Sequence, residues 1–548
     1  MSQEIVQASV LIADDSSTVR QSIRMTLAQA GITRVETASS IGEVRRKLKN
    51  STFDVVLCDF HFGEGMNGQE LLEELRNSGE LPLYTIWIMI TAEASYEKVV
   101  SVAEIGPDDY MIKPFTSNKL TDRISNAWKR KRFLKPIYDK INEGDLPGAI
   151  NAAKELIPKA TGFSTDLMRL LGSLLLEAGR LDEAARLFAE VLAKRIVPWA
   201  KLGLAKVFSR QGKRTQAENV LLECIFEHSQ YVDAYEELAI MYMADGRLTE
   251  AMDIFDKCLS LTPNNVSRLQ KSGNLANMLG DTAKAKELLG RAVLCGGNSS
   301  SLSGETVLQL ALAAKREKNS SDTDKYLRMV KEMAKRDDTV KNQIMSFIAT
   351  ALYEGNPQML EQVMPHMSES DFNLEMAVSF IMAADLVCPP TAENEQANSG
   401  AVPYNWLQQI AQRFVTTRHI SGMLESAANM RPLWQQFIQQ SGAEIIELNH
   451  ESVQLMLKAE FGEALNMLLP KAKHTHNVRL MLSTSHAIIK YLKSDPEIED
   501  NERFKLVSEA HQFIERISGT VDAGTYHMLR DELGEMTGGR TKLLNGIR

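Results

Sequence analysis

The sequence predicts two folds in one chain: a doubly wound α/β parallel sheet at the N-terminus, followed by an all-α helical-repeat solenoid. In the N-terminal part, short apolar runs alternate with amphipathic stretches, a pattern typical of parallel strands joined by helices. In the part that follows, glycines recur every 33 or 34 residues, which is typical of stacked helix pairs. We therefore expect one domain over residues 1–132, repeats over residues 133–336, and an irregular helical array over residues 337–548.

Polar residues directly follow the apolar runs of the N-terminal part. Asp14 and Asp15 follow the first run, and later runs are followed by Asp59, Thr91 and Lys113. In parallel sheets of this kind ligands bind outside the carboxyl ends of the strands, so we expect these side chains to meet at one edge. Three carboxylates in one place need a cation, and Mg²⁺ prefers such oxygen ligands. Because a hydroxyl and an ammonium beside them suit phosphoryl oxygens, the pattern predicts a site that accepts a phosphoryl group.

This arrangement resembles the receiver domain of bacterial two-component response regulators over residues 9–128. The resemblance rests on the strings Asp14-Asp15-Ser16, Thr91-Ala92-Glu93 and Lys113-Pro114-Phe115. It implies a flavodoxin-like fold, and it implies a histidine kinase or a phosphotransfer protein as the source of the phosphoryl group.

The resemblance also implies a role for each residue at this edge. Asp59 is the implied phosphoacceptor. The implied Mg²⁺ ligands are Asp14, Asp15, Asp59 and the backbone carbonyl of His61. Thr91 and Lys113 are expected to hold the phosphoryl oxygens, and Tyr110 is the implied aromatic switch.

One loop departs from the family pattern. Between Asp59 and Gly68 it is one residue longer than usual and lacks the common proline. The resemblance therefore leaves the shape of this loop and the lifetime of the phosphoryl group open.

The peptide bond between Lys113 and Pro114 is commonly cis in the family, which would direct the ammonium inward.

Composition argues against several classes of protein. A net charge of −9 and an isoelectric point of about 5.7 argue against a nucleic-acid binder. The one basic run, residues 129–132, lies at an expected helix end, where cations favour the helix dipole, so we assign it a structural role. The five cysteines show no metal-binding spacing and are expected to be reduced. Without an apolar run near roughly 18 residues or a signal peptide, we expect a soluble cytoplasmic protein with no membrane insertion.

The repeats are marked by residues at fixed spacing. The recurring glycines are Gly179, Gly212, Gly246 and Gly280, each followed five residues later by an alanine and then by a large apolar residue. Glycine suits the turn between two helices, the alanine allows their close approach, and the large residue fills the gap. The pattern is similar to the tetratricopeptide repeat, with residues 235–263 as the closest copy. A degenerate leading repeat is expected around Gly144, and a decayed one over residues 308–333.

Stacked repeats usually present a concave surface that binds proteins, so we expect a downstream protein partner. Six residues of the first helices are expected to face this groove: Arg169, Trp199, Lys206, Arg210, Asn274 and Asn277. Arginine, lysine and asparagine can pair with carboxylates or backbone groups of an extended peptide. The alternative is that these residues are solvated surface groups.

The junction between the two folds is expected to be short and stiff. One amphipathic helix is expected over residues 116–134, and the next should start near Pro136, because proline disfavours helical conformation at Lys135. No Gly/Ser-rich stretch separates them, so a kinked join should couple the two parts. Further on, residues 389–403 are rich in Pro, Asn and Ser and predict an exposed loop.

Together these features predict a phosphorylation-controlled response regulator whose output is protein–protein interaction. We expect no enzymatic activity apart from its own phosphorylation and dephosphorylation. Two alternatives stay open: an enzyme output hidden in the C-terminal helices, such as a phosphatase, and a phosphate sink for a kinase. Whether phosphorylation also drives a homodimer is left open as well.

Overall fold

The computed structural model describes residues 3–61, 66–92, 106–160, 162–297, 301–335, 339–388, 402–428, 430–495, 498–518, 521 and 523–536. The chain divides into two compact units, residues 1–276 with 287–302, and residues 277–286 with 303–548. The predicted boundary at residue 336 was set by the loss of the repeat period and stays a prediction.

The first unit begins with a five-stranded parallel sheet in the order β2-β1-β3-β4-β5. Its strands are β1 (Val10–Ala13), β2 (Val35–Ala38), β3 (Val55–Asp59), β4 (Ile86–Thr91) and β5 (Asp109–Ile112). Every residue of β1, β3 and β4 is buried, which explains why these strands are continuous apolar runs. The sheet confirms the predicted doubly wound fold.

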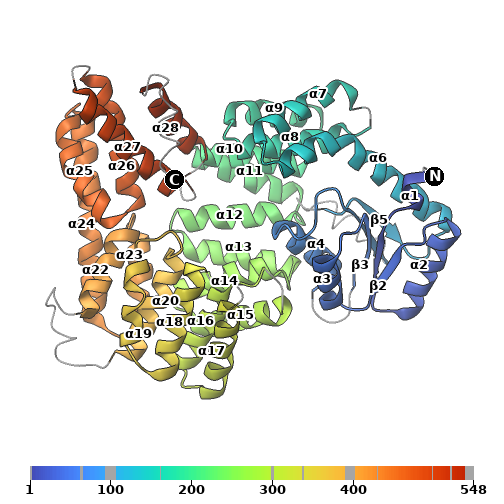
Figure 1. Cartoon of the computed structure of the whole chain (residues 1–548), viewed down its shortest axis with the longest axis horizontal. Coiled ribbons are helices and arrows are strands. Elements are labelled where there is room, and N and C mark those ends of the chain that lie inside the picture. Colours follow the sequence, from blue (N-terminus) through green and yellow to red (C-terminus); the bar gives the residue numbers. More distant parts are fainter. Residues whose placement is uncertain are drawn as a thin grey trace. The chain divides into compact units, whose positions relative to one another are not determined.

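Helices cover both faces of this sheet (Figure 1). They are α1 (Gln3–Val6), α2 (Ser17–Gln29), α3 (Ile41–Asn50), α4 (Gly68–Asn77) and α6 (Ser117–Asn142). Helices α2 and α6 share one apolar core with the sheet, to which they contribute Leu27 and Leu120. Helices α3 and α4 lie on the other face, against β2 and β4 (Figure 1).

The repeats of the first unit are pairs of antiparallel helices. They are α7 (Leu146–Leu156), the short η1 (Ile157–Lys159), α8 (Ser164–Glu177), α9 (Leu181–Lys194), α10 (Pro198–Arg210), α11 (Arg214–Glu227), α12 (Val232–Ala244), α13 (Leu248–Leu261), α14 (Val266–Met278) and α15 (Thr282–Gly296). Each of the four recurring glycines sits in a turn with φ between +67° and +78°, a conformation that strains other residues. Gly144 has the same conformation, at φ +71°, in the turn before α7, as the expected leading repeat requires.

Neighbouring helices of the repeats pack closely because glycines face large apolar side chains. A Cβ atom added to Gly172 would lie 2.6 Å from the Phe188 ring, and one added to Gly203 would lie 2.3 Å from it. Gly273 is related in the same way to Leu289, at 2.4 Å. These contacts fit the predicted role of small residues that let paired helices approach a bulky neighbour.

Helix α6 corrects the prediction of a break at Pro136. It runs from Ser117 to Asn142 with Pro136 inside it, so the last helix of the α/β domain is also the first helix of the repeats. A proline in a helix costs one backbone hydrogen bond. Packing outweighs this cost, because Ile124 is buried in the sheet core and Ile137 in the core of the first repeats.

A buried ion cluster holds α6 against the sheet. Asp108, next to β5, lies 2.6 Å from the guanidinium of Arg130 and 3.1 Å from the ammonium of Lys131. Burial alone would raise the pKa of Asp108, but these cations and Arg76 of α4, at 4.0 Å, hold it below its usual value. Arg130 also lies 3.5 Å from Asp166 of α8. The basic run therefore has a structural role as predicted, but it lies inside a helix and pairs with Asp108 rather than with a helix end.

The second unit is helical throughout its described residues. Its helices are α16 (Gly304–Arg316), α17 (Ser320–Ala334), α18 (Val340–Glu354), α19 (Gln358–Glu361), η2 (Met364–His366), α20 (Leu374–Val387), α22 (Val402–Phe414), α23 (Arg418–Ala427), α24 (Pro432–Leu457), α25 (Phe461–Thr475), α26 (Val478–Ser494), α27 (Asp500–Ile517) and α28 (Ala523–Met536). The pair α16 and α17 coincides with the expected decayed repeat. Most of the predicted loop, residues 389–401, lies outside the described residues, but residues 402 and 403 already belong to α22.

Within the described ranges, no helix has both the length and the apolar character that crossing a membrane requires.

Replacing Gly203 by alanine should lower the free energy of unfolding by about 1–3 kcal/mol, because the new methyl group overlaps the Phe188 ring. Denaturant unfolding followed by circular dichroism measures this change. The matched control is Gly290→Ala in α15, where nothing lies within 4 Å of the added Cβ and helix propensity alone should stabilise by up to about 1 kcal/mol. Equal effects at the two positions would contradict the packing argument.

Candidate phosphoacceptor site

The order of the strands brings the predicted polar residues to one edge of the sheet. Asp14 directly follows β1, Asp59 ends β3, Thr91 ends β4 and Lys113 directly follows β5. Since β1, β3, β4 and β5 are neighbours in this order, their carboxyl ends lie side by side. Sequence reasoning therefore anticipated the position of this cluster.

Three carboxylates form the centre of the site. One oxygen each of Asp14, Asp15 and Asp59 lies within 4.8 Å of the others. Asp14 and Asp59 are buried, at 1% and 9% exposure, whereas Asp15 is exposed. Hard oxygen donors at this spacing fit Mg²⁺, and the exposed Asp15 leaves the cluster open to solvent on one side. The donor set thus agrees with the acidic Mg²⁺ pocket that receiver domains typically contain.

Lys113 supplies the positive charge of the site. Its ammonium lies 2.7 Å from Asp14 Oδ2 and 3.1 Å from Asp59 Oδ1, and the Lys113–Pro114 peptide bond is cis. Burial alone would lower the pKa of Lys113, but its hydrogen bond to Asp14 and the attraction of Asp59 hold that pKa above its usual value. A single ammonium faces three carboxylates here, so a divalent cation would neutralise the remaining negative charge.

The environment also changes the acidity of Asp59. Burial raises the pKa of its carboxyl group, Lys113 opposes this, and the neighbouring Asp14 raises the pKa further. A carboxylate that is held against its preference for water gains from a bound cation. The site is therefore built to couple ionisation of Asp59 to cation binding.

Two further residues, which sequence reasoning did not assign to the site, contact the backbone of its carboxylate residues. Arg20 of α2 donates to the backbone carbonyls of Asp14 and Asp15, at 2.6 and 3.0 Å. Gly68 begins α4 so close to the acceptor that an added Cβ would lie 2.3 Å from the carbonyl oxygen of Asp59. Arginine contacts to carbonyls leave no local pattern, and the loop that ends at Gly68 gives no sign of how close its backbone comes to Asp59.

The two predicted switch residues lie on adjacent strands. Thr91 is 1% exposed at the end of β4, and the hydroxyl oxygen of Tyr110 on β5 is buried. The resemblance also implies that the surface over residues 94–105 and 116–128 changes with these residues; the first segment lies outside the described residues, and the second forms the N-cap and first part of α6. His61 is exposed and packs its ring edge-on against Phe60 at 5.0 Å; the role of its carbonyl as a ligand stays a prediction.

The predicted groove residues all lie on first helices of the repeats, but they have different surroundings. Arg169 and Lys206 line a pocket of about 580 Å³ together with residues of α4, α12 and α14. Trp199 instead packs edge-on against Phe188 at 6.2 Å, and Arg210 donates to the carbonyl of Leu176 in α8.

The side chains of the two predicted asparagines are also partly engaged within the protein. The amide of Asn277 donates a hydrogen bond to Gln309 at 3.0 Å, and the side-chain oxygen of Asn274 is buried. Of the six predicted residues, only Arg169 and Lys206 are among those that line this pocket in the described part of the chain. Periodicity placed these residues on the correct helices, but it did not distinguish a groove-facing side chain from one that packs against a neighbouring helix.

Comparisons with known proteins match both parts of the chain. The response regulator receiver domain model matches residues 10–125, and the tetratricopeptide repeat model matches residues 138–198 and 202–266. Chemotaxis protein CheY-3 of Vibrio cholerae is 33% identical over 121 residues, which is 22% of this chain and 92% of that protein. Chemotaxis protein CheY of Pseudomonas aeruginosa is 31% identical over 121 residues, covering 22% of this chain and 96% of its own. A solved receiver domain structure from Clostridium thermocellum is 29% identical and covers 23% of this chain and 98% of its own, with a TM-score of 0.21.

Acetyl phosphate with Mg²⁺ should label the wild-type protein, and Asp59→Asn should remove essentially all labelling. The pKa of Asp59 is raised, so at low Mg²⁺ its carboxylate becomes protonated at a higher pH than an ordinary aspartate does. Lowering the pH should therefore reduce labelling before the range in which an ordinary aspartate titrates is reached. Saturating Mg²⁺ should move this fall to lower pH, since the cation favours the carboxylate. Phosphate incorporation measured against pH at two Mg²⁺ concentrations tests this.

The control for this experiment is Glu36→Gln, which removes an exposed carboxylate of β2 that forms an ion pair with Lys47. Its labelling should match that of the wild type. A pH profile that does not depend on Mg²⁺ would contradict the coupling between ionisation and cation binding.

Proposed function

Since this chain belongs to the response regulator family through its receiver domain and continues into tetratricopeptide repeats, we propose that it is a phosphorylation-controlled adaptor. A histidine kinase or a phosphotransfer protein phosphorylates Asp59, and the repeats bind a downstream protein differently in the two states. The observation that supports this most is the meeting of three carboxylates with the Lys113 ammonium at one edge of the sheet.

The chemistry follows from the positions of these groups. A carboxylate oxygen of Asp59 attacks the phosphorus of a phosphohistidine, the bond between phosphorus and the histidine nitrogen breaks, and that nitrogen regains a proton. When bound, Mg²⁺ supplies positive charge that screens the carboxylates from the incoming phosphoryl oxygens. Lys113 already contacts Asp59 at 3.1 Å, so its ammonium is within reach of the phosphoryl group that forms there.

The output is assigned to the repeats because of how they are attached and what they expose. Helix α6 belongs to both domains, so a displacement in the receiver is not absorbed by a flexible linker. The pocket lined by Arg169 and Lys206 also contains the carboxylates of Glu236 and Glu237, so it presents groups of both charges to a partner segment. We place this adaptor in the cytoplasm, where the five free cysteines would remain reduced.

The proposal is tested by capturing partners on immobilised full-length protein, with and without beryllofluoride and Mg²⁺. The set of captured proteins should depend on beryllofluoride for the wild type and should not depend on it for Asp59→Asn. Lys206→Glu should weaken capture by at least about tenfold, because it reverses a charge in the pocket.

The matched control is Lys257→Glu, the same charge reversal at an exposed position of the second helix α13. It should leave capture unchanged. Capture that is identical in both phosphorylation states would contradict the adaptor role and would favour a phosphate sink.

A further inference from the structure

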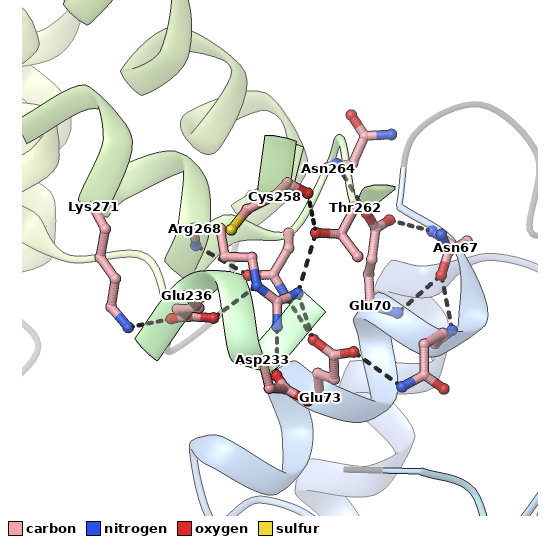
Figure 2. Close-up of polar contacts among 12 residues, drawn as sticks. Asn67, Glu70, Glu73, Asp233, Glu236, Cys258, Thr262, Asn264, Arg268 and Lys271 are labelled. Atoms are coloured by element: carbon pink, nitrogen blue, oxygen red, sulfur yellow. Dashed lines mark hydrogen bonds and ion pairs between the residues drawn. The ribbon is translucent and has the colours of Figure 1, made fainter. Parts of the chain in front are cut away.

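Helix α4 of the receiver contacts the repeats through a group of hydrogen bonds and an ion pair, which we call the α4 latch (Figure 2). The latch consists of Glu70 and Glu73 on α4 and of Asn264, Asn265 and Arg268 at the start of α14. Glu73 Oε2 lies 2.9 Å from the guanidinium of Arg268 and accepts a hydrogen bond from Asn265 at 3.0 Å. Glu70 Oε1 accepts from the backbone N–H of Asn264 at 2.9 Å.

Arg268 is a buried cation shared between the two domains. It is 3% exposed and lies between Glu73 of the receiver, Asp233 of α12 at 3.1 Å and Glu236 of α12 at 2.7 Å (Figure 2). Two of its three carboxylate partners therefore come from the repeats themselves. Arg268 would keep these two partners if the receiver contact were lost, so the repeats do not need Glu73 to neutralise their own buried charge.

The protein environment disfavours the ionised form of Glu73 but favours that of Glu236. Burial raises the pKa of Glu73, and the attraction of Arg268 does not fully offset this effect. For Glu236 burial acts in the same direction, but Arg268 and Lys271 together hold its pKa below the usual value. Exposing Glu73 to water would remove its desolvation cost, which favours opening of this contact.

The latch is connected to the phosphoacceptor through the first turn of α4. The side chain of Asn67 caps this turn by accepting from the backbone N–H of Glu70 at 2.9 Å, and Glu70 Oε2 accepts from the backbone N–H of Asn67 at 3.0 Å. The carboxylate of Glu70 thus joins the start of α4 to Asn264 of the repeats. Gly68, in the same turn, donates to Phe60 at 2.8 Å and has no room for a Cβ beside the carbonyl of Asp59.

We propose that the α4 latch holds the receiver against the groove of the repeats and that phosphorylation of Asp59 releases it. The inference rests on the proposed function, because it takes Asp59 as the phosphoacceptor. With no free space between Asp59 and Gly68, a shift of the acceptor backbone displaces the first turn of α4. A buried ion pair depends on close geometry, so a small displacement favours separation over a strained contact.

Release of the latch also changes what the groove offers to a partner. Glu73 and Asn77 of α4 line the same pocket as Arg169, Lys206 and Lys271. Helix α4 therefore occupies one wall of the surface that we assign to partner binding. Moving α4 away takes Glu73 and Asn77 out of this pocket, whose remaining charged lining includes both Lys206 and Glu237.

The amide of Asn264 reports the state of the latch directly. Pro263 has no N–H, and the N–H groups of Thr262 and Asn265 bond within the repeats, to Cys258 and Thr262. The N–H of Asn264 bonds instead to Glu70 of the receiver. Hydrogen exchange in a peptide that covers residues 262–265 of the full-length protein thus measures the contact between the domains.

In the wild type, beryllofluoride with Mg²⁺ should speed exchange of this amide by at least about tenfold, and Asp59→Asn should show no change. Glu73→Ala should speed exchange to a similar extent without beryllofluoride, since it removes the contacts to Arg268 and Asn265 while alanine preserves α4. Labelling of Glu73→Ala by acetyl phosphate should match the wild type, which would show that the receiver remains folded. The control Glu36→Ala should leave exchange unchanged.

The outcomes separate this inference from the proposed function. If Asp59 is modified and exchange at Asn264 stays the same, the latch is not released by phosphorylation and the inference is overturned. If Glu73→Ala leaves exchange unchanged while the receiver still accepts phosphate, Glu73 does not hold the domains together, which also overturns it. Failure to modify Asp59 at all would instead overturn the proposed function.

Discussion

The buried carboxylate of Asp108 is the constraint on which the arrangement of the first unit depends. It draws Arg130 and Lys131 of α6 onto the end of the sheet, and Arg130 reaches on to Asp166 in the repeats. Because α6 is both the last receiver helix and the first repeat helix, this contact determines where the solenoid begins. Both cations also stay paired in a region where an unpaired charge would be costly.

Charge is distributed differently at the two polar clusters of this unit. At the strand ends, three carboxylates face the ammonium of Lys113, and the excess negative charge suits a cation. At the start of α14, Glu73, Asp233 and Glu236 pair with the two cations Arg268 and Lys271. The first cluster is suited to binding a cation from solution, and the second is suited to holding two parts of the chain together.

The first turn of α4 links these two clusters over a short path. Gly68 lies against the acceptor backbone, and Glu70, two residues later, contacts the repeats. Three residues further along α4, burial raises the pKa of Glu73 more than the attraction of Arg268 lowers it. A connection of this kind transmits displacement through packed backbone rather than through long-range electrostatics, which water and salt would screen.

The amino-acid sequence is enough to predict the fold class, the residues at the strand ends and the phase of the repeats. Each of these follows from local patterns: apolar runs that end in Asp59 or Lys113, and turn glycines such as Gly246 at a regular spacing. Such patterns work because a parallel sheet aligns its strand ends and a helix pair needs a turn residue with positive φ.

How the two domains are joined depends instead on contacts between distant parts of the folded chain. Local rules predicted a helix end before Pro136, yet packing on both sides of α6 carries the helix through it. Arg268 is an ordinary helical arginine in the sequence, and its partner Glu73 lies 195 residues earlier. A buried ion pair between distant segments depends on which surfaces meet in the folded chain, and no local spacing encodes that meeting.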